Sequence, residues 1–168
     1  RMEMDDLNSG LDSLIARGLA DPLRLGILGW SYGGYLTNLA ITKTDRFKAA
    51  VTMYGMSSRE NAYYFGESPS YELEYFGGPP WEKPELYAER SPLRQVDRIH
   101  TPLLLLHGEN DAKVSVMHAK ALWTALTELG RPVQLVRYPG EGHGFRQYEH
   151  KIDASRRTTA WFDLHLRK

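Results

Sequence analysis

The 168-residue sequence contains no cysteine, no long apolar run and no excess of charge of either sign. Without cysteine, neither a disulfide framework nor a thiolate metal site can form. No apolar run approaches the ~20 residues that a membrane-spanning helix needs, and the opening residues do not resemble a signal peptide. The 21 basic and 21 acidic residues balance, whereas binders of nucleic acid or membrane surfaces usually carry a basic excess. We therefore expect a cytoplasmic protein with no nucleic-acid or membrane partner.

The composition that remains is ordinary for a globular protein, with 42% hydrophobic and 25% charged residues. This length is enough for one domain with a sizeable core. The chain does not begin with methionine, so we interpret residues 1–168 as a single domain that is an internal, partial piece of a longer protein.

The most informative stretch is Gly-Trp-Ser-Tyr-Gly at positions 29–33, where an apolar run ends and a helical pattern begins. This order is typical of a nucleophile elbow, a sharp strand-to-helix turn that presents a serine. We predict that Gly29 and Gly33 clear space around the strained Ser31, and that Gly34 lets the helix approach the sheet. The new helix would direct its N–H groups and partial positive charge at an oxyanion beside Ser31. The alternative is an ordinary Gly-Ser loop.

Hydrophobic periodicity predicts alternating helices and strands along the rest of the chain. In the helix that follows Ser115, we expect this serine to cap the N-terminus and Trp123 to face inward. The alternation predicts an α/β fold with a mostly parallel sheet of about four strands and helices on both faces. The expected helices are 5–18, the segment from Ser31 to 41, 115–130 and 152–166, the strands are 23–28, 47–54, 102–108 and 133–138, and a connection at 56–98 holds short helical pieces at 71–76, 85–89 and 92–96.

Three residue types suited to acyl-transfer chemistry follow three of these strands. They are Ser31, Asp111 and His143, and functional residues of such sheets lie just beyond the carboxyl ends of strands. The chain order Ser, Asp, His is that of the α/β-hydrolases. Ser31 would attack a carbonyl, His143 would transfer the proton, and Asp111 would orient the imidazole. The backbone N–H of Tyr32 would be one oxyanion donor. Taken singly, the aspartate could be a turn former and the histidine a mobile loop residue.

The other histidines do not form a metal-binding pattern. We expect His107 to be a buried histidine with satisfied hydrogen bonds. The remaining histidines show no ligand spacing, and Gly33-Gly34 is not part of a phosphate-binding loop, so we expect no metal and no cofactor. The histidines expected on loop or helix surfaces are His100, His118, His150 and His165.

Taken together, residues 29–35, 107–114 and 138–145 resemble the catalytic domain of prolyl oligopeptidase-type serine peptidases, particularly the acylaminoacyl-peptidase and dipeptidyl-peptidase branch. The resemblance implies the C-terminal part of an α/β-hydrolase fold, a Ser31–His143–Asp111 triad, short peptide substrates and no cofactor. It also implies a set of residues that line the pocket for the substrate residue before the scissile bond. These are Tyr32, Tyr54 and Val114, with Tyr63 and Tyr64 adding to the wall.

The same resemblance implies parts that these residues do not contain. The family's catalytic domain has further strands before the first helix, which carry the second oxyanion donor, and a β-propeller precedes them. Without a neighbour, the strand at 23–28 would be an exposed apolar edge, which proteins avoid. We therefore expect the chain to pair with the N-terminal portion of a larger peptidase or with a second copy. A carboxylesterase on the same scaffold and a non-catalytic fragment remain alternatives.

Overall fold

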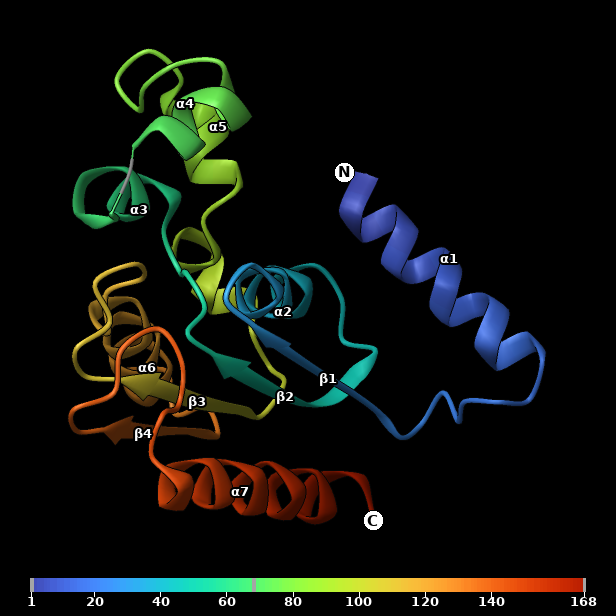
Figure 1. Cartoon of the computed structure of the whole chain (residues 1–168). Helices are drawn as coiled ribbons and strands as arrows, with labels where there is room; N and C mark the ends of the chain where they lie inside the picture. Colours follow the sequence, from blue (N-terminus) through green and yellow to red (C-terminus); the bar gives the residue numbers. More distant parts are fainter. Residues whose placement is uncertain (1, 68, 168) are drawn as a thin grey trace.

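The computed structural model describes residues 2–67 and 69–167, and its centre is a parallel sheet (Figure 1). The strands are β1 (Leu25–Trp30), β2 (Phe47–Met53), β3 (Leu103–Gly108) and β4 (Val133–Tyr138). They lie in the order β1-β2-β3-β4, and each neighbouring pair is parallel. The predicted four-stranded α/β architecture is therefore confirmed. Ser68, inside the predicted connection 56–98, lies outside the described residues.

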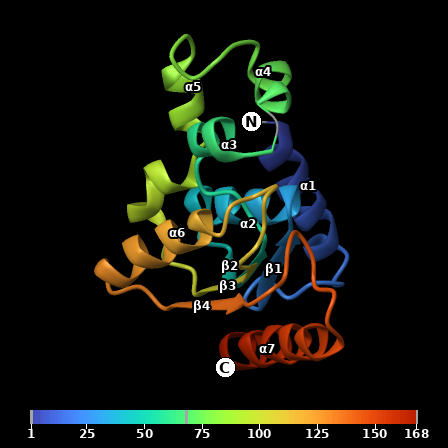
Figure 2. The ribbon, with the colours of Figure 1, turned by 60° about the vertical axis from the view of Figure 1, so that its left-hand side comes forward.

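Helices cover both faces of this sheet (Figures 1 and 2). Successive strand residues point to opposite faces, so Leu103 and Leu105 enter one apolar cluster while Leu104 and Leu106 enter another. The first cluster lies under the helices α1, α2 and α6 and the 3-10 helix η1, and the second lies against α7. The bounds are α1 (Met2–Ala16), α2 (Tyr32–Lys43), η1 (Pro92–Arg98), α6 (Met117–Glu128) and α7 (Tyr148–Leu166). None of the helices in the described part is long and apolar enough to cross a bilayer.

The connection between β2 and β3 rises above the sheet as a group of short helices (Figure 1). Besides η1, it holds α3 (Arg59–Phe65), α4 (Ser70–Phe76) and α5 (Pro84–Glu89). Helix α3 is absent from our sequence prediction. Its start has a clear local cause, because the Ser58 hydroxyl accepts a hydrogen bond of 3.1 Å from the N–H of Asn61.

Several element ends differ from the sequence expectation. Strand β1 begins at Leu25 because Asp21 closes a turn, its carbonyl accepting from Arg24 N–H at 3.0 Å and its side chain from Leu23 N–H at 2.9 Å. Helix α7 begins at residue 148, four residues before the expected start. Ser115 does accept the Met117 N–H, at 3.3 Å, but α6 has no side-chain cap at its N-cap position.

Trp123 is not an inward-facing residue, contrary to expectation. Its exposed fraction is 37%, whereas Leu122 and Leu126 are fully buried. Residues 122 and 126 lie four apart and share one helix face, so the adjacent position 123 is turned away from the core.

Candidate active site

The nucleophile elbow is a strained turn between β1 and α2. Ser31 has φ 56° and ψ −118°, an unfavourable backbone conformation for a residue with a side chain. Its N–H donates to the Met53 carbonyl at 2.9 Å, which fixes the turn to β2. A Cβ on Gly29 would lie 2.0 Å from the Gly33 carbonyl oxygen, and a Cβ on Gly34 would lie 2.8 Å from the Met53 carbonyl oxygen. Glycine is therefore required at positions 29 and 34.

Gly33 does not have the role that the sequence suggested. No heavy atom outside the neighbouring residues and the helix's own backbone lies within 4 Å of a Cβ placed there. The chain folds back over residue 29, so only one of the two flanking glycines supplies the clearance.

A continuous chain of hydrogen bonds joins the three candidate catalytic side chains. Ser31 Oγ lies 2.7 Å from His143 Nε2, and His143 Nδ1 lies 2.7 Å from Asp111 Oδ2. The residues follow β1, β4 and β3, so the carboxyl edge of the sheet brings them together. An ionised carboxylate can only accept, so Nδ1 carries the proton and Nε2 is free to accept from the serine hydroxyl.

The Asp111 carboxylate is surrounded by four donors. Oδ1 accepts from the N–H groups of Lys113 and Val114, both at 3.0 Å, and Oδ2 lies 3.2 Å from His107 Nε2 as well as close to His143. Burial opposes ionisation of Asp111, but the hydrogen bonds from His107, His143 and the Val114 N–H outweigh it and hold its pKa below the usual value.

His107 is the buried histidine that the sequence predicts, with 1% of its surface exposed. Its Nε2 lies 2.8 Å from the carbonyl oxygen of Val114 and 3.2 Å from Asp111 Oδ2. Both partners are acceptors, so Nε2 must be protonated. The contact between His107 and Asp111 is absent from our sequence prediction. Its only sequence signal is the His-Gly pair four residues before the aspartate.

Aromatic rings hold the His143 imidazole in place. The rings of Trp30 and Tyr54 have centroids 5.2 and 5.5 Å from it, and Phe145 lies 5.2 Å from Tyr54. Tyr54 is fully buried at the end of β2, and burial raises the pKa of its hydroxyl, which therefore stays protonated. Trp30 and Phe145 are absent from our list of site residues. They flank the serine and histidine motifs, but nothing in the sequence indicates ring contact.

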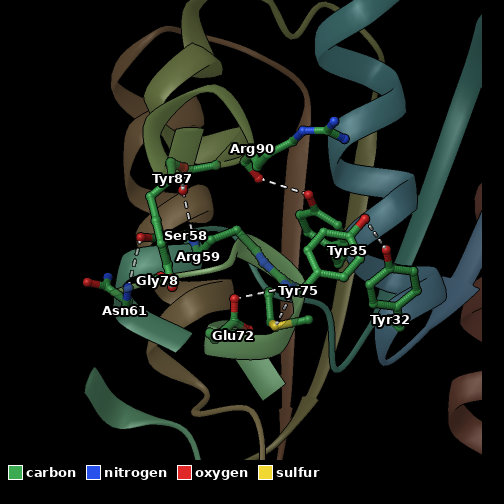
Figure 3. A network of polar contacts seen from close by, with 12 residues as sticks. Tyr32, Tyr35, Ser58, Arg59, Asn61, Glu72, Tyr75, Gly78, Tyr87 and Arg90 are labelled. Atoms are coloured by element: carbon green, nitrogen blue, oxygen red, sulfur yellow. Dashed lines mark hydrogen bonds and ion pairs between the residues drawn. The ribbon is translucent and has the colours of Figure 1, made fainter. Parts of the chain in front are cut away.

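The other predicted pocket residues lie in two groups. Tyr32 is the first residue of α2 and packs on a buried cluster that contains Val114. Its hydroxyl donates to the Tyr75 hydroxyl at 3.1 Å (Figure 3). The Tyr75 hydroxyl in turn donates to the Glu3 carboxylate. The second group lies in α3, and its role as a pocket wall stays a prediction. There Tyr63 packs on Trp81 and Tyr87, and Tyr64, 53% exposed, packs on Tyr63 and Phe65.

A fully buried arginine, Arg59, packs against Tyr35 and Tyr75, the two tyrosines whose rings contact Tyr32. Its Nη2 is 2.9 Å from Glu72 Oε2, and both side chains are at least 96% buried. Its guanidinium carbon lies 4.8 Å from the ring centroid of Tyr35 and 5.3 Å from that of Tyr75 (Figure 3). Sequence reasoning missed this pair because arginine and glutamate are rarely buried and have no distinctive spacing here.

His118 corrects a sequence expectation. It does not lie on a helix surface, because only 4% of it is exposed and its Nδ1 accepts from the Ser57 N–H at 3.2 Å. Burial lowers the pKa of His118 to about 4, so the ring is neutral at ordinary pH. Within the described ranges, no group of three metal-ligating side chains is found.

The fold and this arrangement of side chains define an α/β-hydrolase-type protein. The strand–serine–helix elbow, the parallel sheet and the Ser, Asp, His order all agree with that class. Comparison with known proteins narrows the class further. The model of the prolyl oligopeptidase family matches residues 1–168, and the chain belongs to this family.

Three similar proteins are named as peptidases, and each is longer than this chain. An uncharacterized peptidase, YuxL, of Bacillus subtilis is 35% identical, and the match covers 98% of this chain and 26% of that protein. Dipeptidyl-peptidase 5 of Porphyromonas gingivalis is 31% identical, with 98% and 25% covered. A puromycin-hydrolyzing peptidase of Mycobacterium tuberculosis superposes with a TM-score of 0.90 at 34% identity, with 97% and 25% covered. The chain thus spans about a quarter of the length of these relatives.

Proposed function

We propose that this chain carries the catalytic triad of a serine peptidase that hydrolyses short peptides through an acyl-enzyme. The observation behind the proposal is the hydrogen-bond chain from Ser31 Oγ through His143 to Asp111, with both links at 2.7 Å. These distances lie within the range needed for a nucleophile and its general base. Membership of a family whose relatives are named as peptidases supports the substrate class.

In the proposed reaction, Ser31 Oγ bonds to the carbonyl carbon of the scissile peptide while His143 Nε2 takes the hydroxyl proton. The tetrahedral intermediate collapses, and His143 returns this proton to the leaving amine. His143 Nε2 then takes a proton from water, whose oxygen bonds to the carbonyl carbon of the acyl-enzyme. When this second intermediate collapses, the ester bond to Ser31 Oγ breaks, His143 returns the proton to Oγ, and the second product leaves. Asp111 stabilises the imidazolium at each stage, and its four donors keep it ionised.

The developing oxyanion needs donors close to Ser31. The N–H of Tyr32 is suitably located, because the first N–H groups of a helix have no acceptor within that helix. We propose that a second donor comes from a segment that pairs with the free edge of β1, supplied by the N-terminal part of a larger peptidase or by a second copy. Loss of one such donor typically lowers kcat by about 100- to 1,000-fold.

A fluorophosphonate probe tests the nucleophile directly. The chain should be labelled at Ser31, and Ser31→Ala should abolish labelling. His143→Ala should slow labelling by about 10,000-fold or more, because removing the base of such a triad costs at least this factor in kcat. The exposed Ser155→Ala on α7 is a matched control and should label normally. If the folded chain is not labelled at Ser31, it is a non-catalytic partner and the proposal is wrong.

Substrate comparison tests the reaction class. A dipeptidyl amide and an acyl-aminoacyl amide should both be compared with a p-nitrophenyl ester. A peptidase cleaves at least one amide with a rate that depends on its peptide portion, whereas cleavage of the ester alone would assign a carboxylesterase.

A further inference from the structure

His143 lies in a loop whose backbone has little intrinsic rigidity. The loop joins β4 to α7 and contains Gly140, Gly142 and Gly144, two of them at positive φ, 74° and 157°. Glycine loses more conformational freedom on ordering than any other residue. The imidazole must nevertheless keep two hydrogen bonds of 2.7 Å at once. Trp30 and Tyr54 pack on the imidazole ring, but they do not fix the backbone of the loop, so a further group is needed to hold that backbone in one conformation.

The Glu141 side chain is suited to this task. Only 1% of the residue is exposed, and its carboxylate points back into its own loop. Oε2 accepts from the Arg146 N–H at 2.8 Å, and Oε1 accepts from the Gln147 N–H at 2.9 Å and lies 2.8 Å from His150 Nδ1. These bonds close residues 141–147 into a ring around His143 and attach the ring to the start of α7.

The backbone of Glu141 joins the histidine loop to the aspartate loop. Its carbonyl accepts from the Asn110 N–H at 2.8 Å, next to Asp111. A Cβ on Gly108 would lie 2.5 Å from the same carbonyl oxygen, so the two loops are in direct contact at this point. One residue thus fixes the histidine loop through its side chain and the distance between the two loops through its main chain.

The carboxylate is ionised in this setting. Burial alone would raise the pKa of Glu141, but the N–H groups of Arg146 and Gln147, with His150, outweigh burial and lower it. A buried carboxylate accepts from several donors at once. A glutamine could accept with its oxygen only, and its NH₂ group would face a donor.

We propose that Glu141 is a positioning residue for the triad, which acts through His143 by holding the imidazole between Ser31 and Asp111. This inference rests on the proposed function of the triad and adds a residue to it. It follows that loss of the carboxylate should weaken proton transfer and leave substrate binding almost unchanged.

Glu141→Gln tests the proposal against Glu149→Gln, an exposed glutamate in the first turn of α7. Provided that the probe labels a sample of the wild-type chain at Ser31, unlabelled Glu141→Gln should show a kcat about 100-fold below that of the unlabelled wild type, and its rate of labelling should fall by the same factor, a loss typical of displaced catalytic groups. KM should stay within about twofold, as expected when only transition-state interactions are lost. Glu141→Asp keeps the charge and should recover part of the rate. Glu149→Gln should behave as the wild type.

Proton NMR provides a second measurement that does not require turnover. The chain has a mass of 19.2 kDa, and the His143 Nδ1 proton that donates to Asp111 should give a low-field signal. Glu141→Gln should broaden or shift this signal upfield while the amide spectrum stays folded. The proposal is overturned if the variant keeps both the signal and the wild-type kcat, or loses stability alone. Failure of the wild type to label would instead count against the proposed function, and the NMR comparison would still decide the role of Glu141.

Discussion

At the scale of single residues, Ser31, the proposed nucleophile, has a backbone conformation that a residue with a side chain adopts only under constraint. Ser31 has φ 56°, and conformations of this kind cost of order 1–3 kcal/mol. The surroundings supply the constraint through the Ser31 N–H bond to Met53 and the contact of Gly29 with the returning chain. The two glycines of the motif are therefore not equivalent.

We predict opposite outcomes for alanine at these two positions. Gly29→Ala puts a methyl group 2.0 Å from a backbone oxygen and should destabilise the fold by about 3 kcal/mol or more, at the upper end for single substitutions. Gly33→Ala meets no neighbour and lies in the first turn of α2, where alanine should stabilise by up to about 1 kcal/mol. Urea unfolding of both variants checks this. Equal midpoints would contradict the assignment.

The difference between these glycines marks the limit of what the sequence could predict. Ser31, Asp111 and His143 could be identified because strand ends and their order can be read from the periodicity of a parallel sheet. The role of Gly33 and the burial of His118 could not, because both depend on which distant segment packs nearby. His118 lies on α6, and its hydrogen-bond partner Ser57 is 61 residues away in the sequence.

At the scale of elements, the connection between β2 and β3 is stabilised by polar contacts inside an aromatic shell. Arg59 of α3 and Glu72 of α4 form an ion pair with 0% and 4% side-chain exposure. Burial raises the pKa of Glu72 even beside this arginine, which indicates how much desolvation the pair must overcome. The sequence predicts short helices at 71–76 and 85–89 but misses α3, which is no shorter, because its buried residues include the charged Arg59 and apolar periodicity does not count such a residue as part of a core.

We predict that the Arg59–Glu72 pair contributes far more to the free energy of unfolding than the exposed ion pair of Glu60, which also lies on α3. Glu72→Leu leaves Arg59 charged and buried, and should cost about 3–5 kcal/mol. Glu60→Leu breaks the ion pair with Arg94, in which the Arg94 side chain is 62% exposed and the Glu60 side chain 25%. This change should cost less than about 1 kcal/mol. The double variant Arg59→Met/Glu72→Leu should recover most of the stability, because an apolar pair fits an aromatic shell. Thermal unfolding of the three variants measures this. A double variant less stable than Glu72→Leu would contradict it.

At the scale of the whole molecule, α7 covers one face of the sheet and α1, α2 and α6 cover the other (Figure 1). The edge at β1 is not covered by a further strand, because β1 has only one neighbour among the described strands. Its sequence, Leu-Gly-Ile-Leu-Gly-Trp, contains neither charge nor proline. Leu28 and Trp30 are 55% and 52% exposed. Exposed apolar edges of this kind bind further strands unless charge or proline protects them.

We therefore predict that the isolated chain self-associates through β1 until another strand occupies this edge. Sedimentation velocity should show association that increases with concentration, and Leu28→Lys should weaken it by at least about tenfold, since lysine protects strand edges. Leu164→Lys is the matched control, because Leu164 is 56% exposed on α7 rather than on a strand, and its association should match the wild type.

Hydrogen exchange gives the complementary measurement. The amides of β1 should exchange slowly in the associated form and faster in Leu28→Lys at the same concentration. A wild-type chain that stays monomeric at every concentration, with β1 amides that exchange freely, would show that this edge needs no partner.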